Sequence, residues 1–216
     1  MYRWKWRVSQ MAVIYRISVG IAQGLDHLHT GLQKPVIHGN LKSKNILLDR
    51  NYQPYISDFG QHLLLNPSAG QEMLESCGAQ GYRAPELIKM KDVCQETDIY
   101  SLGVILLELL TGREPINENP SADEDFYLPN SLRNAVLDHR IKDVFNPLIL
   151  LSPVSEECVL KLFQLAMACF VATGNSGGCG DDIDFDAHNF DKGTVESVTG
   201  TFRGKALSEA NKIEVF

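Results

Sequence analysis

The sequence predicts a mainly α-helical fold, a bundle of helices that carries short β-hairpins. Three segments point to this class: residues 14–28, 98–110 and 155–170, in which apolar residues recur at helical spacing or form nearly unbroken runs. The chain has 216 residues, of which 44% are hydrophobic and 22% charged. This length and composition are those of a globular protein with a substantial core.

The first helix is predicted by an apolar stripe with steps of three and four residues. Gly31 and Pro35 would end this helix, because glycine suits its C-terminal cap and proline cannot continue it. Short β-rich pieces follow at residues 36–37, 46–48 and 55–57, and they predict small hairpins. The stripe consists of Ile14, Ile17, Ile21, Leu25 and Leu28.

The middle of the chain predicts one clear helix. Residues 61–86 have little periodicity, so we expect no regular element there. Residues 98–110 form an apolar helix, closed by Thr111 and by Gly112, which suits a left-handed cap.

Two more helices are predicted further on. Residues 117–129 are polar and contain proline, so they are expected to form a loop, followed by a short helix over 131–137. A longer helix begins near Ser155, where apolar residues recur with helical periodicity. Residues 172–204 are rich in Gly, Asp, Ser, Thr and Asn, and we expect them to be poorly ordered.

Composition excludes several classes of function. The formal charge of -7 argues against a general nucleic-acid binder, which needs a basic excess to meet phosphates. We expect a soluble chain, because no signal peptide opens the sequence and its longest apolar run is far too short to cross a bilayer. The cysteines fit a reducing compartment and offer no metal-site spacing, since they are odd in number and widely separated: Cys77, Cys94, Cys158, Cys169 and Cys179.

Four short motifs occur in a fixed order along the chain. His38–Asn45 is followed by Asp58-Phe59-Gly60, then by Ala84-Pro85-Glu86, and then by residues 98–103, which open an apolar helix. In this order they resemble the C-terminal lobe of a eukaryotic protein kinase. The wording of the motifs is most similar to plant receptor-like kinases of the leucine-rich-repeat type, and above all to inactive members with His-Gly-Asn in the catalytic loop.

The resemblance divides the chain into three parts. Residues 1–11 are an N-terminal lead-in, residues 12–170 a partial kinase domain, and residues 171–216 an atypical, poorly ordered tail. The expected fold is therefore a kinase-like C-lobe without the β-sheet of the N-lobe. The basic and aromatic residues 1–7 would form either a membrane-surface contact or a helix lead-in.

Four residues match the nucleotide side of the family's active site. Asp58 and Asn45 correspond to the ligands of magnesium, which prefers oxygen donors, and Lys42 corresponds to the lysine that approaches the transferred phosphate. Leu47 corresponds to the apolar residue beneath the adenine ring. The alternative reading for Asp58 and Asn45 is local bracing of the loop by hydrogen bonds.

The same resemblance shows what the catalytic loop lacks. Asn40 stands in place of the catalytic Asp, and an amide is a very poor base, whose presence instead of a carboxylate typically costs about 10²–10⁴-fold in rate. Ala79 replaces the family's Thr that bridges this Asp and Lys42. Gly39 replaces the Arg that pairs with a phosphorylated activation segment.

Other matched residues have scaffold roles. His38 and Phe59 correspond to a stacked pair and are expected to lie in the core. Asp98 corresponds to the buried Asp that accepts N–H groups of the catalytic loop, with a plain helix N-cap as the alternative. Glu86 is expected to lack its usual Arg partner, or to find another such as Arg140.

The predicted function is that of a truncated receptor-like kinase domain of pseudokinase type, a signalling or protein-interaction module without autonomous phosphotransfer. Its partners would be proteins, other receptor kinases among them, and Mg-ATP would bind weakly because half of the nucleotide pocket is not encoded. The expected location is the cytoplasm, at the face of the plasma membrane if the chain belongs to a longer receptor. One alternative is a fragment of an active Ser/Thr kinase, and another is the non-functional product of a truncated gene.

Overall fold

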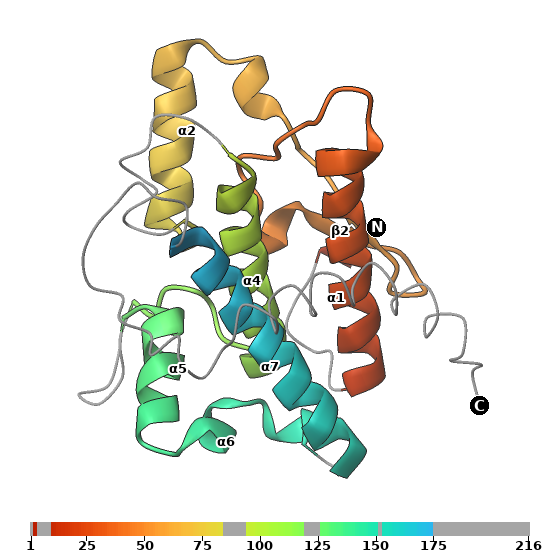
Figure 1. The fold of residues 1–216 in the computed structure, drawn as a ribbon, viewed down its shortest axis with the longest axis vertical. Coiled ribbons are helices and arrows are strands. Elements are labelled where there is room, and N and C mark those ends of the chain that lie inside the picture. The colour runs from red at the N-terminus through yellow and green to blue at the C-terminus, as the bar shows by residue number, and fades with distance from the viewer. Residues whose placement is uncertain (1, 4–9, 84–93, 119–125, 151–152, 175–216) are drawn as a thin grey trace.

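The computed structural model describes residues 2–3, 10–83, 94–118, 126–150 and 153–174. The described part of the chain is mainly helical. Four helices build its core: α1 (Met11–Asp26), α4 (Gln95–Thr111), α5 (Leu128–Leu137) and α7 (Pro153–Gly174). Helix α4 runs through the centre, α7 crosses it, and α1 and α5 flank it on opposite sides (Figure 1). The mainly α-helical class predicted from the sequence is confirmed for the described residues.

Helix α4 is buried along almost its whole length, which is why its sequence is apolar on every face. Its closest neighbour is α7, and Gly103 lies at their crossing. A Cβ atom on this glycine would come within 2.9 Å of Cβ of Cys169 and 3.0 Å of the carbonyl oxygen of Ala166. The glycine therefore allows the two helices to approach closely.

The predicted apolar stripe is confirmed, because all five of its residues are buried, four of them in α1 and Leu28 in the turn that follows. A π-helical turn, η1 (His27–Gly31), ends the segment. The expected cap of α4 is also present, since Gly112 has φ of 69° in the left-handed region. Both predictions used local sequence features, the apolar spacing and the glycine cap, which agree with how the helices pack.

A small sheet of three antiparallel strands lies beside α1, in the order β1 (Tyr2–Arg3), β2 (Ile46–Leu48) and β3 (Pro54–Ile56). Tyr2 pairs with Leu48, and Ile46 pairs with Ile56. The prediction of a helical lead-in is wrong for Tyr2–Arg3, because these two residues form a strand of the sheet; the other residues of the predicted lead-in up to position 9 lie outside the described residues. Residues 36–37 are not a strand either, since the N–H of Val36 donates to the carbonyl of Leu28 instead.

Helix α2 (Pro67–Ala79) was not predicted, and it occupies the stretch expected to be irregular. It stands at one end of the molecule and makes no extensive contact with another described element (Figure 1). A short 3₁₀ turn, η3 (Gln61–Leu63), precedes it. Its mixed polarity left no clear periodicity for a sequence argument to detect.

The later helices begin earlier than predicted. Helix α5 starts at Leu128, with Pro129 in its first turn, where proline is tolerated. A short α6 (Ile141–Val144) and a 3₁₀ turn, η4 (Pro147–Ile149), lead to α7. Helix α7 extends to Gly174, so residues 172–174 are helical and not irregular as expected; the rest of the predicted tail lies outside the described residues.

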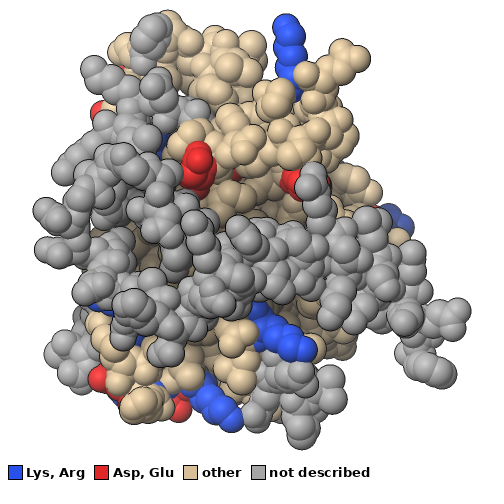
Figure 2. All heavy atoms as spheres, viewed as in Figure 1, with Lys and Arg blue, Asp and Glu red and all other residues tan. Residues whose placement is uncertain are grey.

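The described surface carries scattered charges. Figure 2 shows Lys, Arg, Asp and Glu side chains distributed over the described part of this face without a broad patch of one sign. Among the described helices, none is both long and apolar enough to span a bilayer.

Candidate functional site

The loop from His38 to Asn45 is held by Asp98, a residue of the first turn of α4 that is 1% exposed. The carboxylate accepts hydrogen bonds from the backbone N–H of His38 at 2.7 Å and of Gly39 at 2.9 Å. His29 Nε2 lies 2.8 Å from Oδ2 of the same carboxylate. The N-cap alternative is wrong for Asp98, because the N-cap residue of α4 is Cys94.

Gly39 and His38 give the loop its shape. Gly39 has φ of 76°, a left-handed conformation that a residue with a side chain adopts at a cost. His38 is fully buried, and its Nδ1 accepts from the N–H of Asn40 at 3.3 Å. Burial lowers the pKa of His38, which favours the neutral ring. Its Nε2 finds no hydrogen-bond partner among the described residues.

Phe59 is not a core residue, so the prediction for its side chain is wrong. It is 48% exposed, next to Leu63 and Leu64 of the following turn, which are exposed to 67% and 88%. The two residues that flank it, Asp58 and Gly60, have φ of 62° and 67°. These left-handed conformations turn the chain sharply, and no described element covers the Phe59 ring fully.

Asn45 and Asp58, the residues matched to magnesium ligands, both make local hydrogen bonds. Asn45 is buried, and its Nδ2 donates to the carbonyl oxygen of Asn40 at 3.0 Å. Asp58 is exposed, and its carboxylate accepts from Ser57 Oγ at 3.0 Å and from Gln61 Nε2 at 3.1 Å. These bonds hold the loop and the following turn in place.

Few side chains near the loop could bind a metal ion. The described residues contain no group of three or more His, Cys, Asp or Glu side chains that could hold an ion. Asp58 supplies a carboxylate and Asn45 an amide oxygen, which are hard donors that suit magnesium. Because magnesium takes six ligands, such a site would depend on nucleotide phosphates and water for the others.

Three other matched residues, Asn40, Lys42 and Leu47, differ in their surroundings. Asn40 is buried, and its Oδ1 finds no donor among the described residues. Lys42 is half-buried, and its Nζ donates to Oε1 of Gln80 at 3.3 Å. Leu47 is half-buried in β2, on the opposite face from the buried Ile46 and Leu48.

Sequence reasoning missed Gln80. This residue follows Ala79 directly, and its amide meets the ammonium group of Lys42. Its Nε2 donates to Ser76 Oγ at 3.2 Å, which links the loop to helix α2. The only signal in the sequence was a polar residue beside Ala79, where the resemblance places a threonine.

A second buried cluster, Ser43–Tyr82–Glu108, was also missed. Tyr82 donates to both carboxylate oxygens of Glu108 at 2.9 Å, and Ser43 Oγ lies 2.8 Å from the Tyr82 hydroxyl and 3.3 Å from Glu108 Oε1. Burial raises the pKa of Glu108 to about 8 and raises that of Tyr82 as well. The sequence signal was Glu108 itself, a charge inside the apolar run of α4.

The cluster ties three segments together: the loop through Ser43, the residues just after α2 through Tyr82, and α4 through Glu108. Ser101 of α4 adds a bond from its Oγ to the carbonyl of Tyr82 at 2.7 Å. Glu86 lies outside the described residues. Its suggested partner Arg140 is exposed and pairs with Asp138 at 2.8 Å.

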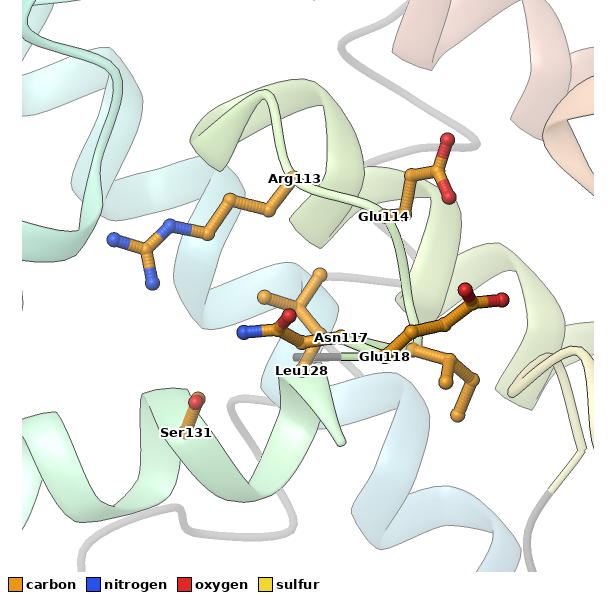
Figure 3. Close-up of a pocket in the computed structure, with 7 residues that line it drawn as sticks. Arg113, Glu114, Asn117, Glu118, Leu128 and Ser131 are labelled. Atoms are coloured by element: carbon orange, nitrogen blue, oxygen red, sulfur yellow. The ribbon is translucent and has the colours of Figure 1, made fainter. Parts of the chain in front are cut away.

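One pocket, of about 500 Å³, lies away from the loop, between the end of α4, the segment after it and the start of α5. Figure 3 shows Arg113 and Ser131 on one side of it and Glu114 and Glu118 on the other. With both signs of charge, it selects no single class of ligand. None of the residues matched to the nucleotide site lines it: the lining residues are Arg113, Glu114, Ile116, Asn117, Glu118, Leu128 and Ser131.

Comparisons with known proteins agree on one family. The sequence profile described as "Protein kinase domain" matches residues 5–159. The leucine-rich repeat receptor-like protein kinase IMK3 of Arabidopsis thaliana, described as probable, is 44% identical over 156 residues, which cover 71% of this chain and 19% of the relative. A protein of the same plant described as a "probable inactive receptor kinase" is 39% identical over 155 residues, which cover 71% of this chain and 23% of the relative.

A solved structure supports the fold. The pseudokinase domain of BIR2, described as an immune regulator of the RLK/Pelle family, superposes with a TM-score of 0.67 at 26% identity. The match covers 95% of this chain and 57% of that one. The chain thus spans about a fifth of the length of the curated relatives and a little over half of the solved domain.

Proposed function

Because this chain belongs to the protein kinase domain family, we propose that it is a receptor-like kinase domain of the pseudokinase type, which binds proteins and does not transfer phosphate by itself. The observation that carries the proposal is Asn40. Protein kinases place an aspartate in this position to accept the proton of the substrate hydroxyl. A buried amide can orient a hydroxyl but cannot take its proton at neutral pH.

One further observation supports the loss of catalysis, and another supports a retained scaffold. The ammonium group of Lys42, matched to the lysine that approaches the transferred phosphate, donates to the neutral amide of Gln80. The loop nevertheless keeps an ordered shape through the bonds from His38 and Gly39 to Asp98. A surface for protein binding needs this scaffold and does not need the base.

Phosphotransfer is tested with radiolabelled ATP, magnesium and a generic protein acceptor. We expect no incorporation above a blank without protein, and none after Asp58→Ala. Incorporation by the wild-type chain that disappears in Asp58→Ala would refute the proposal. An Asn40→Asp variant shows whether the base alone is missing, because it supplies a carboxylate and leaves Lys42 with Gln80.

Binding to proteins is tested by isothermal titration with the purified kinase domain of an active leucine-rich-repeat receptor kinase. We expect a saturable heat of binding that is the same with and without Mg-ATP, since the binding would not depend on catalysis. The variant Asp98→Ala, which removes the anchor of the loop, should weaken binding if the loop face takes part. A flat titration with several such domains would contradict an interaction module.

Mg-ATP would be a weak ligand of this chain. On this proposal Asp58 and Asn45 hold magnesium, and Leu47 contacts the adenine. A thermal unfolding experiment with millimolar Mg-ATP measures this directly, with Asp58→Ala as control. An unchanged midpoint in the wild type would remove ATP from the ligands.

A second candidate is a segment of an active Ser/Thr kinase. Two observations favour it: the match covers only about a fifth of the length of these relatives, and the chain retains Lys42, Asn45 and Asp58. On either proposal the location is the cytoplasm, at the membrane face in a longer receptor. A coding sequence that continues upstream into a glycine-rich loop and a membrane span, with phosphotransfer by the longer product, would establish the second candidate.

A further inference from the structure

Exposed apolar side chains gather directly after Asp58, in the turn that contains η3. Their exposed fractions range from 40% to 88%, and Leu64 is the most exposed of them. They lie close together, because a 3₁₀ turn advances only about 2 Å per residue and the Cδ1 atom of Leu63 lies 3.7 Å from the place that a Cβ of Gly60 would take. We call this surface the leucine patch; it consists of Phe59, Leu63, Leu64 and Leu65.

The size of the leucine patch indicates a contact surface. A fully exposed side chain of this kind presents roughly 200 Å², so the exposed fractions of the four residues amount to on the order of 500 Å². The largest apolar patch on a soluble monomer typically measures about 300–600 Å² and often binds a partner. A single exposed leucine, such as Leu148 in η4, is by contrast normal on a protein surface.

The leucine patch lies in an uncharged stretch of the chain. Residues 59–71 contain no Asp, Glu, Lys or Arg. The carboxylate that precedes them, Asp58, already accepts hydrogen bonds from Ser57 Oγ and Gln61 Nε2. A partner selected by charge therefore finds little to pair with on this surface, whereas an uncharged apolar surface is complementary to a copy of itself.

The position of the leucine patch leaves it open to a second molecule. The turn with η3 leads into α2 at one end of the molecule, and α6 lies at the other end (Figure 1). Because the patch residues keep between 40% and 88% of their surface exposed, a second molecule can approach this end without displacing a described element.

We propose that two copies of this chain associate through their leucine patches about a two-fold axis. In such a contact the same surface serves both copies, so one apolar patch is sufficient. Two facing patches would bury about 1,000 Å², and a polar rim that includes the exposed Asn66 and Ser68 brings the contact to the lower end of specific interfaces, about 1,200 Å². The dimer is therefore weak and reversible, with a dissociation constant on the order of 10 µM.

The association is tested by sedimentation equilibrium of the whole chain at concentrations from about 1 µM to about 100 µM. We expect monomers at the lowest concentration and mainly dimers at the highest. Leu64→Asp should weaken the dimer at least about 10-fold, because it places a charge in each half of an apolar interface. Leu64→Met keeps an apolar side chain of similar volume and should leave the dissociation constant unchanged.

A matched control places the same charge elsewhere. Leu148→Asp also changes an exposed leucine, but η4 follows α6 at the opposite end of the molecule from α2 (Figure 1). It should leave the dimer intact. Because Leu64 is 88% exposed, Leu64→Asp should keep the fold, which circular dichroism and the thermal midpoint verify.

Salt distinguishes an apolar contact from a charged one. About 1 M salt reduces the Debye length to about 3 Å and so removes most attraction between exposed charges. The dimer should be as strong or stronger under these conditions, and dissociation by salt would contradict an apolar interface.

Two other results would overturn the proposal. A chain that stays monomeric at the highest concentration would leave the leucine patch to a different partner. A dimer of equal strength in Leu64→Asp would place the contact on another surface. Neither result bears on Asn40 or on phosphotransfer, so the proposed function would stand in both cases.

Discussion

The buried carboxyl of Glu108 makes a sharp prediction about stability and pH. Its side chain is 0% exposed, and burial raises its pKa from 4.5 to about 8, while the donors Tyr82 and Ser43 partly oppose this rise. Because the folded state binds this proton more tightly than the unfolded state, folding stability is highest at acidic pH in this respect. It declines as pH rises from about 4.5 to about 8, and then levels off.

The size of the effect follows from the shift. One pKa unit corresponds to about 1.4 kcal/mol, so the contribution is on the order of a few kcal/mol across this window. Glu108→Gln removes the titrating group and keeps an oxygen that can accept from Tyr82. We therefore expect the wild type to lose stability between pH 5 and pH 9 relative to Glu108→Gln, and the variant to be the more stable chain at pH 9.

The assay is urea unfolding at pH 5, 7 and 9, followed by circular dichroism. All other titrating groups are common to the two chains, so the difference in unfolding free energy at each pH isolates Glu108. The slope of free energy against urea should be the same for both chains, which shows that the denatured states are alike. Parallel pH profiles for wild type and Glu108→Gln would refute the reasoning.

Three further predictions can be checked by urea unfolding. Asp98→Ala leaves buried N–H groups of the loop without an acceptor, so it should destabilise the fold by about 3 kcal/mol or more and speed amide exchange in the loop. A loss of less than about 1 kcal/mol would contradict the role of Asp98 as an anchor. Gly103→Ala should lower the unfolding free energy by about 1–3 kcal/mol, because the new Cβ would press on Cys169. The control Gly70→Ala, where no atom lies within 4 Å of a Cβ, should be neutral or stabilising. Equal effects of the two substitutions would argue against close packing of α4 and α7. Phe59→Ser should cost less than about 1.5 kcal/mol because the ring is 48% exposed, and a loss typical of a core phenylalanine would restore the core assignment.

The elements that could be predicted were those whose local pattern and final packing agree. The stripe of α1 and the apolar run of α4 are periodic or continuous because each helix buries the corresponding surface. Helix α2 has no such pattern, since it stands at one end of the molecule and makes no extensive contact with another described element. Strand β1 consists of two residues and exists only through its pairing with β2, 44 or more positions away in sequence.

Some features of the candidate site could likewise be predicted from the sequence and others could not. Motif order identified the loop and Asp98, because these positions are fixed by the fold and by backbone hydrogen bonds. The contact between Gln80 and Lys42 and the cluster around Glu108 depend on side chains from distant segments, which no local pattern reveals. Phe59 was misplaced because a motif gives the residue's position along the chain but says nothing of what covers its ring.

The anchor at Asp98 has a consequence for how this loop can change over evolutionary time. Its carboxylate binds backbone N–H groups, which every residue except proline possesses, so it holds positions 38 and 39 without regard to most of their side-chain chemistry. The anchor itself therefore places little restriction on which side chains these two positions carry, provided that the left-handed conformation at position 39 is respected. The backbone shape of such a loop can therefore persist after the side chains needed for catalysis have been replaced.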